Sequence, residues 1–391
     1  MSGLTGDGKG SVLGTVAAGW FVVLGARYVV PALLPYVREE FAFSSTLAGV
    51  VVTVIWVTYA LMQFPAGTMA DRVGERPLLA VSLLTGGASL LVFYVAPGVG
   101  VFLLACALFG FATGLFGPPR ATILTRTFRE NDGVAFGIVL AAGSVGAAGL
   151  PIATTWLTEQ YGWRTALGGI APVFLALGVV SWLVLPDDGG GSAVEFSVGA
   201  VRSAIANRGV VLAVLAMTVM LFAMQGLTAF FPTYLHEQKG LTETTAASVY
   251  ALLFLGGGVS QWLAGSAADR FGHHRVMLAV SAFSVLPLVA LPFVDGVLAL
   301  SAVAITLGVR LAVGPLSNGY IVRLLAEEVQ GTAWGLLRTA FFVVGSFGSV
   351  AVGAMADQGL FDVAFLLLAL LTAVATVVYV FLPDRGTAAR V

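Results

Sequence analysis

The charged residues of this chain fall in short clusters, and apolar stretches of about 20 residues separate them. A helix of that length, rising about 1.5 Å per residue, crosses the hydrocarbon core of a bilayer. Only 10% of the 391 residues are Asp, Glu, Lys or Arg, whereas soluble domains contain about 25%. Because a soluble protein of this length needs more charge on its surface, the sequence predicts an all-α membrane protein.

Twelve transmembrane spans are predicted, with ends placed to within a few residues. They cover residues 13–36, 46–69, 78–97, 100–124, 134–157, 165–185, 209–234, 243–266, 276–294, 297–322, 332–355 and 361–382. The first span is too long for the apolar region of a cleavable signal, and Arg27 interrupts it. We therefore expect every span to be part of the folded protein.

Only one connection between the predicted spans is long. Residues 186–208 begin with Pro186 and contain a Gly-Gly-Gly-Ser run, which is typical of a flexible linker. We therefore expect an N-terminal six-helix bundle at 1–185, a cytoplasmic linker at 186–208 and a C-terminal six-helix bundle at 209–391.

The distribution of Lys and Arg predicts the orientation in the membrane. With both termini in the cytoplasm, the inside loops and tails hold twelve of them: Lys9, Arg72, Arg76, Arg126, Arg129, Arg202, Arg208, Arg270, Arg275, Arg323, Arg385 and Arg390. The outside loops hold only Arg38, Arg164 and Lys239. We expect a multi-pass protein of the cell membrane with both termini cytoplasmic.

The two halves of the chain repeat each other. Residues 63–74 and 261–272 are identical at seven of twelve positions, at an offset of 265 − 67 = 198 residues. The same offset relates Gly133 and Gly137 to Gly331 and Gly335. Internal duplication of this length is typical of transporter folds.

Both copies of this segment resemble the cytoplasmic loop signature of the major facilitator superfamily, which follows helices 2 and 8. The copies read Gly67-x-x-x-Asp71-Arg72-x-Gly74-x-Arg76 and Gly265-x-x-x-Asp269-Arg270-x-Gly272-x-x-Arg275. Gly162-Trp163-Arg164, ahead of the sixth span, is similar to a less specific feature of the same family. The resemblance implies a secondary transporter with two pseudo-symmetric six-helix bundles, which rocks between inward-open and outward-open states.

The loop residues are the candidates for gating. A carboxylate ahead of the third or ninth span meets a positive helix N-terminus, and in the family it helps to latch the outward-open state. The resemblance therefore assigns gating to Gly67, Asp71, Arg72, Asp269 and Arg270. The glycines are also expected to let neighbouring helices approach closely.

The alternative for these loops is a basic segment that only sets topology and caps a helix. The chain also departs from the family at two places in this signature. Glu75 stands where the family usually has a basic residue, and His273-His274 precede Arg275 in the second copy.

Arginines are the only charged residues placed well inside the predicted spans. Arg27 lies in the first, Arg310 in the tenth and Arg338 in the eleventh, and Arg120 follows Pro118-Pro119 in the fourth, from where it can reach the membrane edge. Every Asp and Glu falls in a loop, a tail or a span end. A charge at mid-depth costs at least a few kcal/mol and usually faces a cavity.

The guanidinium group suits carboxylate, phosphate or nitrate-like oxyanions, because it presents a planar fork of donors. In the family, helices 1, 4, 7 and 10 line a central cavity, and Arg27 and Arg310 fall on two of these helices. We therefore predict a small organic or inorganic anion bound between Arg27 and Arg310, with Gln225 and Arg338 assisting.

Several alternatives remain open. The arginines can serve packing alone, by bonding free helix carbonyls or the faces of aromatic residues such as Trp20 and Tyr28. Multidrug efflux is the rival function, because the many Phe, Met and Trp residues can line an apolar pocket. It predicts little effect of removing the charge at Arg27 and Arg310. A transporter-fold sensor that binds without transport is a further alternative.

Coupling to protons through the protein is not predicted, because no titratable side chain of useful pKa lies within the spans. Anion exchange, facilitated transport or co-transport of a proton on the substrate all fit. We expect no cofactor, metal or nucleic-acid site, and no enzyme activity, because the spans lack a His/Asp/Glu cluster. The expected partners are a small substrate and the bilayer, for a chain that functions as a monomer.

Overall fold

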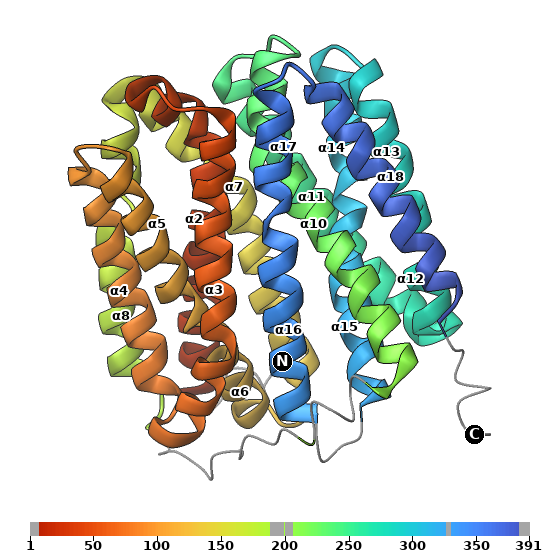
Figure 1. Cartoon of the computed structure of the whole chain (residues 1–391). Coiled ribbons are helices and arrows are strands. Elements are labelled where there is room, and N and C mark those ends of the chain that lie inside the picture. The colour runs from red at the N-terminus through yellow and green to blue at the C-terminus, as the bar shows by residue number, and fades with distance from the viewer. Residues whose placement is uncertain (1–7, 188–198, 200–205, 326–329, 383–391) are drawn as a thin grey trace. The chain divides into compact units, whose positions relative to one another are not determined.

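The structure is a computed structural model that describes residues 8–187, 199, 206–325 and 330–382. Within these residues the chain is almost entirely helical and has no strand (Figure 1). Eleven helical stretches of the described residues are long and apolar enough to cross a membrane. The longest, Asp132–Val184, contains 53 residues and is long enough for two spans. The all-α membrane fold is confirmed, and twelve spans are consistent with it.

The chain divides into two compact units, which are described separately below. Unit 1 consists of Met1–Phe43, Val51–Val194 and Thr242–Ala251, and unit 2 of Ser44–Val50, Glu195–Leu241 and Leu252–Val391. Most of the predicted linker at 186–208 and both ends of the chain lie outside the described residues. The predicted boundaries at 185 and 209 stay a prediction.

The first six predicted spans correspond to seven helices. These are α2 (Lys9–Phe41), α3 (Ser45–Val73), α4 (Glu75–Val95), α5 (Val99–Gly114), α6 (Gly117–Thr127), α7 (Asp132–Gly168) and α8 (Ala171–Val184). The fourth span is split into α5 and α6, and prolines occupy the first turn of α6, where their missing N–H groups cost nothing. Gly162 turns α7 with φ 80° and ψ 155°, a conformation that favours glycine. Helices α4 and α8 pack against each other (Figure 1).

The second half contains shorter helices and more breaks. They are α10 (Arg208–Glu237), α11 (Glu243–Phe271), α12 (His273–Phe283), α13 (Val285–Ala290), η2 (Leu291–Phe293), α14 (Val297–Leu307), η3 (Gly308–Ala312), α15 (Val313–Leu324), α16 (Gln330–Ser346), α17 (Gly348–Ala356) and α18 (Phe361–Val380). The 3₁₀ segment η3 interrupts the tenth span and contains Arg310. A 3₁₀ segment within a helix often marks a functional hinge or strain.

The 198-residue offset also relates the helix ends of the two repeats. Gly74 caps α4 and Gly272 caps α12, with φ 84° and 90°. Positive φ of this size favours glycine because it has no Cβ. Ser44 and Thr242, again one offset apart, each accept a hydrogen bond from the backbone amide three residues on, at the starts of α3 and α11. The duplication seen in the sequence is therefore present in the local structure.

Close helix contacts occur at another repeat-related pair of glycines. A Cβ at Gly110 would lie 2.2 Å from the carbonyl oxygen of Ile55, and one at Gly308 would lie 2.3 Å from that of Leu253. At Gly67, by contrast, the nearest atom is 3.9 Å away, and at Gly265 no atom lies within 4 Å. The expectation of close approach at Gly67 and Gly265 is therefore wrong for the described contacts. The close contacts lie instead at Gly110 near the end of α5 and at Gly308, the first residue of η3.

Carboxylates bind the starts of α3 and α11. In unit 2, Asp357 accepts hydrogen bonds from the backbone amides of Ser45 and Thr46, at 2.6 and 2.8 Å, and from the Thr46 hydroxyl at 2.6 Å. In unit 1, the hydroxyl of Thr244 donates to Glu159. Thr46 and Thr244 are one offset apart, and so are Glu159 and Asp357. The two contacts are therefore repeat counterparts.

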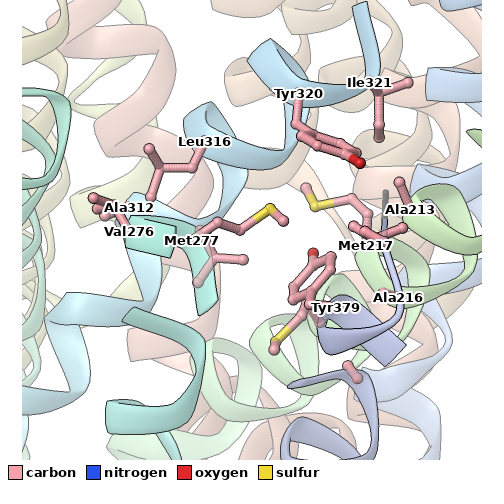
Figure 2. Packing of buried hydrophobic residues seen from close by; sticks show 14 of the residues in the cluster. Ala213, Ala216, Met217, Val276, Met277, Ala312, Leu316, Tyr320, Ile321 and Tyr379 are labelled. Carbon is pink, nitrogen blue, oxygen red and sulfur yellow. The ribbon is translucent and has the colours of Figure 1, made fainter. Parts of the chain in front are cut away.

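The apolar core of unit 2 is rich in methionine and tyrosine. Figure 2 shows Met217, Met277 and Tyr379 packed among small aliphatic side chains. The Tyr379 hydroxyl lies 2.8 Å from the hydroxyl of Ser317, so the ring's polar end is satisfied within the core. These methionines serve as packing residues in this cluster.

Candidate substrate-binding site

Arg27 lies near the middle of α2 and is only 1% exposed. Its guanidinium carbon lies 4.0 Å from the centroid of the Tyr59 ring and 5.4 Å from that of Trp56. Its Nη2 donates a hydrogen bond to the carbonyl oxygen of Thr113 at 3.3 Å. A cation on an aromatic face gains about 0.5–2 kcal/mol. These contacts fix the position of the guanidinium, and they are of the kind that the packing alternative predicts.

A second arginine shares an aromatic neighbour with Arg27. The guanidinium carbon of Arg120, on α6, lies 3.9 Å from the centroid of Trp20, and that of Arg27 lies 5.5 Å from it. Phe116 stacks on the same indole with ring centroids 6.2 Å apart. A Cβ at Gly143 would lie 2.3 Å from Trp20 Nε1, so this glycine makes room for the ring. Two guanidinium groups of unit 1 therefore face one indole.

Arg310 has different neighbours in unit 2. It is 5% exposed, and its Nη1 donates to the hydroxyl of Thr372 at 2.9 Å and to that of Ser284 at 3.5 Å. Its Nη2 donates to the carbonyl oxygen of Met220 at 3.5 Å. Among the described residues these partners are all neutral, and Nε has none. The charge of Arg310 is therefore solvated by hydroxyl and carbonyl groups of other helices.

The two assisting residues of the predicted site also lie in unit 2. Gln225, on α10, is 2% exposed, and its amide nitrogen has no hydrogen-bond partner among the described residues. Arg338, on α16, is half-buried, and its guanidinium carbon lies 5.7 Å from the centroid of Phe342. Within the described residues, no hydrogen bond joins either of them to Arg310.

Some residues at these positions were not among the predicted site residues. They include Trp56 and Tyr59, because an aromatic side chain alone does not indicate an arginine neighbour. Asn318, on α15, has a buried carbonyl oxygen Oδ1 without a hydrogen-bond partner among the described residues. The available signal for Asn318 was the repeat, because it lies one 198-residue offset from Arg120.

The gating candidates lie where α3 and α11 end. Arg72, Asp269 and Arg270 are exposed, and Asp71 is half-buried. Within the described residues, no hydrogen bond or ion pair joins Asp71 or Asp269 to another side chain. The gating role that the resemblance assigns to these residues stays a prediction.

Glu75 and His273, which depart from the loop signature, each contact an arginine. Glu75 is buried, and its carboxylate pairs with Nη2 of Arg126 at 3.1 Å. At the matching position of the second repeat, His273 Nδ1 lies 2.9 Å from Nη1 of Arg323. The first contact joins the start of α4 to the end of α6. The second joins the start of α12 to the end of α15. The unusual residues therefore have a packing function at these helix ends.

The less specific Gly162-Trp163-Arg164 feature joins three helices of unit 1. The indole of Trp163 donates to Glu40 Oε2 at 2.5 Å, and Arg164 pairs with the same carboxylate. Arg164 also donates to the carbonyl oxygen of Ala96 at 2.8 Å. This segment therefore ties the start of the sixth span to the ends of α2 and α4.

A duplicated bundle of apolar helices with buried arginines defines a class, the multi-pass membrane transporters with internal repeats. A family model described as Major Facilitator Superfamily matches residues 15–348 and, in a second match, 243–390. The chain belongs to the Major Facilitator Superfamily.

Curated relatives of several transport functions are similar to this chain. An uncharacterized MFS-type transporter, YfnC of Bacillus subtilis, is 24% identical over 84% of this chain and 82% of its own length. A probable sulfoacetate transporter, SauU of Cupriavidus necator, is 25% identical over 95% and 93%. The multidrug resistance protein MdtG of Yersinia enterocolitica is 25% identical over 74% and 73%. The relatives agree on transport across a membrane and differ in substrate.

Solved structures share the fold. The nucleoside transporter NupG matches with a TM-score of 0.80 and 15% identity, over 96% of this chain and 100% of that chain. A bacterial homologue of the human lysosomal transporter Spinster matches with a TM-score of 0.78 and 14% identity, over 96% and 97%. At these identities the likeness concerns the fold alone.

Proposed function

We propose that this protein is an alternating-access transporter of a small anion, and that Arg27 is its principal anion-binding residue. The observation that carries the proposal is a guanidinium buried near the middle of a spanning helix, 1% exposed and framed by the rings of Tyr59 and Trp56. A charge at this depth is expensive, and such residues usually serve substrate or ion pathways. The aromatic rings add rigidity, which lowers the cost of ordering the guanidinium when an anion binds.

Arg310, Gln225 and Arg338 complete the proposed set of substrate contacts. The buried amide nitrogen of Gln225 is a donor without a described partner, which costs about 1–3 kcal/mol unless something else satisfies it. A substrate oxygen is such a partner. Arg310 carries a full charge among neutral partners, so an approaching anion gains from it even where the guanidinium also holds helices together.

One relative supports an anionic substrate, and another supports a different substrate class. The relative named as a probable sulfoacetate transporter covers almost the whole chain, and sulfoacetate is an anion. The multidrug relative favours the rival function, efflux of hydrophobic compounds. The two differ in one respect that can be measured, because only the anion carrier needs the charge of Arg27.

The remaining features of the proposal follow from the family and the repeat. We propose two six-helix bundles, at 1–185 and 209–391, joined by a cytoplasmic linker, with both termini in the cytoplasm of a cell-membrane monomer. Gly67, Asp71, Arg72, Asp269 and Arg270 are the proposed gating residues. Transport without enzyme activity is the proposed function, with anion exchange, facilitated transport or a proton carried on the substrate as its modes.

The test is uptake into proteoliposomes of labelled nitrate, phosphate, lactate and succinate, beside the lipophilic cation tetraphenylphosphonium. We expect saturable uptake of an anion by the wild type, and its loss in Arg27→Gln. Arg129→Gln, which removes an exposed charge outside the spans, is the matched control and keeps the uptake. Transport of the cation alone, unchanged in Arg27→Gln, contradicts the proposal and favours efflux. Arg310→Ala, measured in parallel, shows whether the second arginine acts on uptake or only on folding.

A further inference from the structure

A cavity with three basic side chains lies at one end of unit 1. Its volume is about 750 Å³, and its lining includes Lys9, Arg126 and Arg129. Lys9 begins α2, Arg126 lies in the last turn of α6, and Arg129 lies in the turn that precedes α7. Pockets that hold small ligands typically measure about 300–1,000 Å³. Three cations from three separate elements therefore meet at a cavity of the size that a ligand needs.

A buried carboxylate holds Arg126 at this cavity. The side chain of Glu75 is 4% exposed, and its Oε2 pairs with Nη2 of Arg126 at 3.1 Å. The side chain of Arg126 is 33% exposed, so it also reaches the cavity while the pair anchors it. The acid that departs from the loop signature therefore positions a guanidinium at the cavity wall.

The turn between α6 and α7 is fixed by its own contacts. Phe128 is buried, and its carbonyl oxygen accepts a hydrogen bond from the amide of Asn131 at 2.8 Å. Among the described residues, the Asn131 side chain makes no capping hydrogen bond to α7, and it lines the cavity. Glu130 is the acid in the described lining, so the lining carries a net charge of 3 − 1 = +2. The cavity is therefore positively charged and has a further amide donor.

The second repeat has no positive charge at the three matching positions. The residues one 198-residue offset from Lys9, Arg126 and Arg129 are Asn207, Leu324 and Glu327. The duplication therefore does not account for the cluster, which belongs to the first repeat alone. A function of this repeat, separate from the shared fold, explains it better.

The cavity is also separate from Arg27. Lys9 and Arg27 lie on the same helix, 27 − 9 = 18 residues apart, which corresponds to about 27 Å along its axis. Arg27 is buried near the middle of α2, whereas the cavity lies where α2 begins. A ligand of the cavity is therefore distinct from the substrate proposed for Arg27, and its binding does not rest on anion transport.

An exposed apolar face of α7 begins next to the cavity. Val134, Ile138 and Val145 are 53%, 41% and 53% exposed. Their spacings of four and seven residues place them on one side of the helix, and the first lies three residues after Asn131. A positively charged cavity beside an apolar helix face suits a molecule with an anionic head and an apolar tail.

We propose that this cavity binds the phosphate group of an anionic phospholipid. Lys9, Arg126 and Arg129 contact the phosphate oxygens, since guanidinium and ammonium groups both donate to phosphate. The acyl chains lie along the exposed face of α7. The bound lipid then connects the beginnings of α2 and α7 with the end of α6.

The experiment measures lipid binding to the purified full chain by native mass spectrometry, at constant ionic strength. The probes are dioleoyl phosphatidylglycerol, which is anionic, and dioleoyl phosphatidylcholine, which has the same chains and no net charge. Glycerol 3-phosphate is the soluble probe, because it has the phosphate and lacks the chains. We expect one phosphatidylglycerol to bind at least about fivefold more tightly than phosphatidylcholine, and glycerol 3-phosphate to bind much more weakly than either.

The variants assign this preference to the cavity. Lys9→Gln and Arg129→Gln should each raise the dissociation constant of phosphatidylglycerol by about threefold to tenfold and leave that of phosphatidylcholine unchanged. Glu130→Gln, which removes the opposing charge, should lower it by about twofold. Arg126 is not substituted, because its pair with Glu75 also joins α4 to α6.

Two matched controls remove an arginine elsewhere. Arg208→Gln removes an exposed charge at the start of α10, and Arg27→Gln removes the charge of the proposed substrate site. Both should bind phosphatidylglycerol as the wild type does. Because the cavity is separate from Arg27, we also expect Lys9→Gln and Arg129→Gln to keep the anion uptake of the wild type. A monodisperse elution profile and an unchanged unfolding temperature confirm that each variant is folded.

Three results would contradict the proposal. Equal affinity for the two lipids would show that the cavity does not recognise the anionic group. An equal loss in Arg208→Gln and Lys9→Gln would show that general surface charge attracts the lipid. If glycerol 3-phosphate binds as tightly as phosphatidylglycerol, and Lys9→Gln weakens both, the ligand is a soluble phosphate ester and the assignment to a lipid is wrong. None of these results bears on uptake through Arg27, so the two proposals fail separately.

Discussion

Arg27 on α2 and Arg310 in η3 are both buried arginines, but their surroundings differ in kind. Aromatic faces and one carbonyl oxygen surround Arg27, with the nearest ring centroid 4.0 Å away. Hydroxyl groups of Thr372 and Ser284 and a carbonyl oxygen surround Arg310. An aromatic face attracts a cation without using its N–H donors, whereas a hydroxyl or carbonyl acceptor occupies them.

The difference indicates two roles for a buried arginine, which are binding of the substrate and stabilisation of the fold. The ring contacts of Arg27 hold its guanidinium through the π faces of Tyr59 and Trp56. The contacts of Arg310 link η3 to α10 and α18, so removing the side chain disturbs three elements of unit 2. We therefore expect transport to depend most on Arg27 and stability to depend most on Arg310.

The largest expected effect is that of the charge at Arg27. Loss of a charge-assisted hydrogen bond costs about 1.5–3 kcal/mol, so Arg27→Gln should weaken anion affinity by about tenfold to a hundredfold. Arg27→Lys keeps the charge but loses the planar fork, so an intermediate loss is expected. Competition binding of the anion measures both. Equal affinity of all three proteins would show that Arg27 only packs.

The second-largest effect is expected on the stability of the protein, through the hydrogen bonds of Arg310. Thr372→Val removes the closest acceptor of the buried guanidinium at nearly unchanged volume, and we expect a loss of about 1–3 kcal/mol in the free energy of unfolding. Anion affinity should change by less than about twofold. Denaturant unfolding in detergent measures the first quantity and anion titration the second. A large loss of affinity with unchanged stability would instead make Arg310, and not Arg27, the principal anion-binding residue.

A smaller effect on stability is expected at two glutamines that occupy matching positions in the two repeats. Gln63→Leu and Gln261→Leu each remove one amide hydrogen bond of 3.1 Å to a backbone carbonyl, in unit 1 and unit 2 respectively. Each should cost about 1 kcal/mol of stability. Similar losses, measured by the same unfolding assay, support equivalent structural roles. A loss of transport without a loss of stability in either variant would instead place that glutamine at the substrate.

The smallest effect concerns the carboxylates at the starts of α3 and α11. Partial burial raises the pKa of Asp357, but the hydrogen bonds from Thr46 and Ser45 outweigh it and lower the pKa from 3.8 to about 2. Because the folded-state pKa is depressed, the contact stabilises the protein above about pH 4, and this stabilisation is lost as the pH falls towards 2.

Asp357 is exposed, so solvent screening keeps the contribution below about 1 kcal/mol. Asp357→Asn should therefore lower stability slightly at pH 7 and remove that part of the pH dependence, as thermal unfolding between pH 3 and 7 would show. Glu159→Gln, at the repeat counterpart, is the matched variant for unit 1. A steeper acid loss in Asp357→Asn than in the wild type would contradict the assignment.

The all-α membrane fold could be predicted because span length and charge spacing follow directly from bilayer thickness. The repeat was predictable because the loop signature keeps seven of twelve residues. The breaks in the spans were not, because η3 and the turn between α5 and α6 depend on neighbouring helices as much as on local sequence. Sequence spacing also misplaced the close helix approach, which falls at Gly110 and Gly308.

The candidate site was predictable only in part. Charge within a span identified Arg27 and Arg310, because few other functions explain an arginine at that depth. The sequence could not distinguish their surroundings, because the rotation of each helix decides whether the side chain meets Tyr59 or Thr372. Asn318 was missed, because a single amide among apolar residues gives no signal until its repeat counterpart is considered.

The central claim is that this member of the superfamily carries a small anion by means of Arg27. The most direct test is counterflow in proteoliposomes, in which unlabelled anion inside drives uptake of the same labelled anion, with Arg27→Gln compared to Arg27→Lys. We predict accumulation by the wild type, a reduced rate in Arg27→Lys and none in Arg27→Gln. Undiminished accumulation by Arg27→Gln, in a protein of normal stability, would contradict the account.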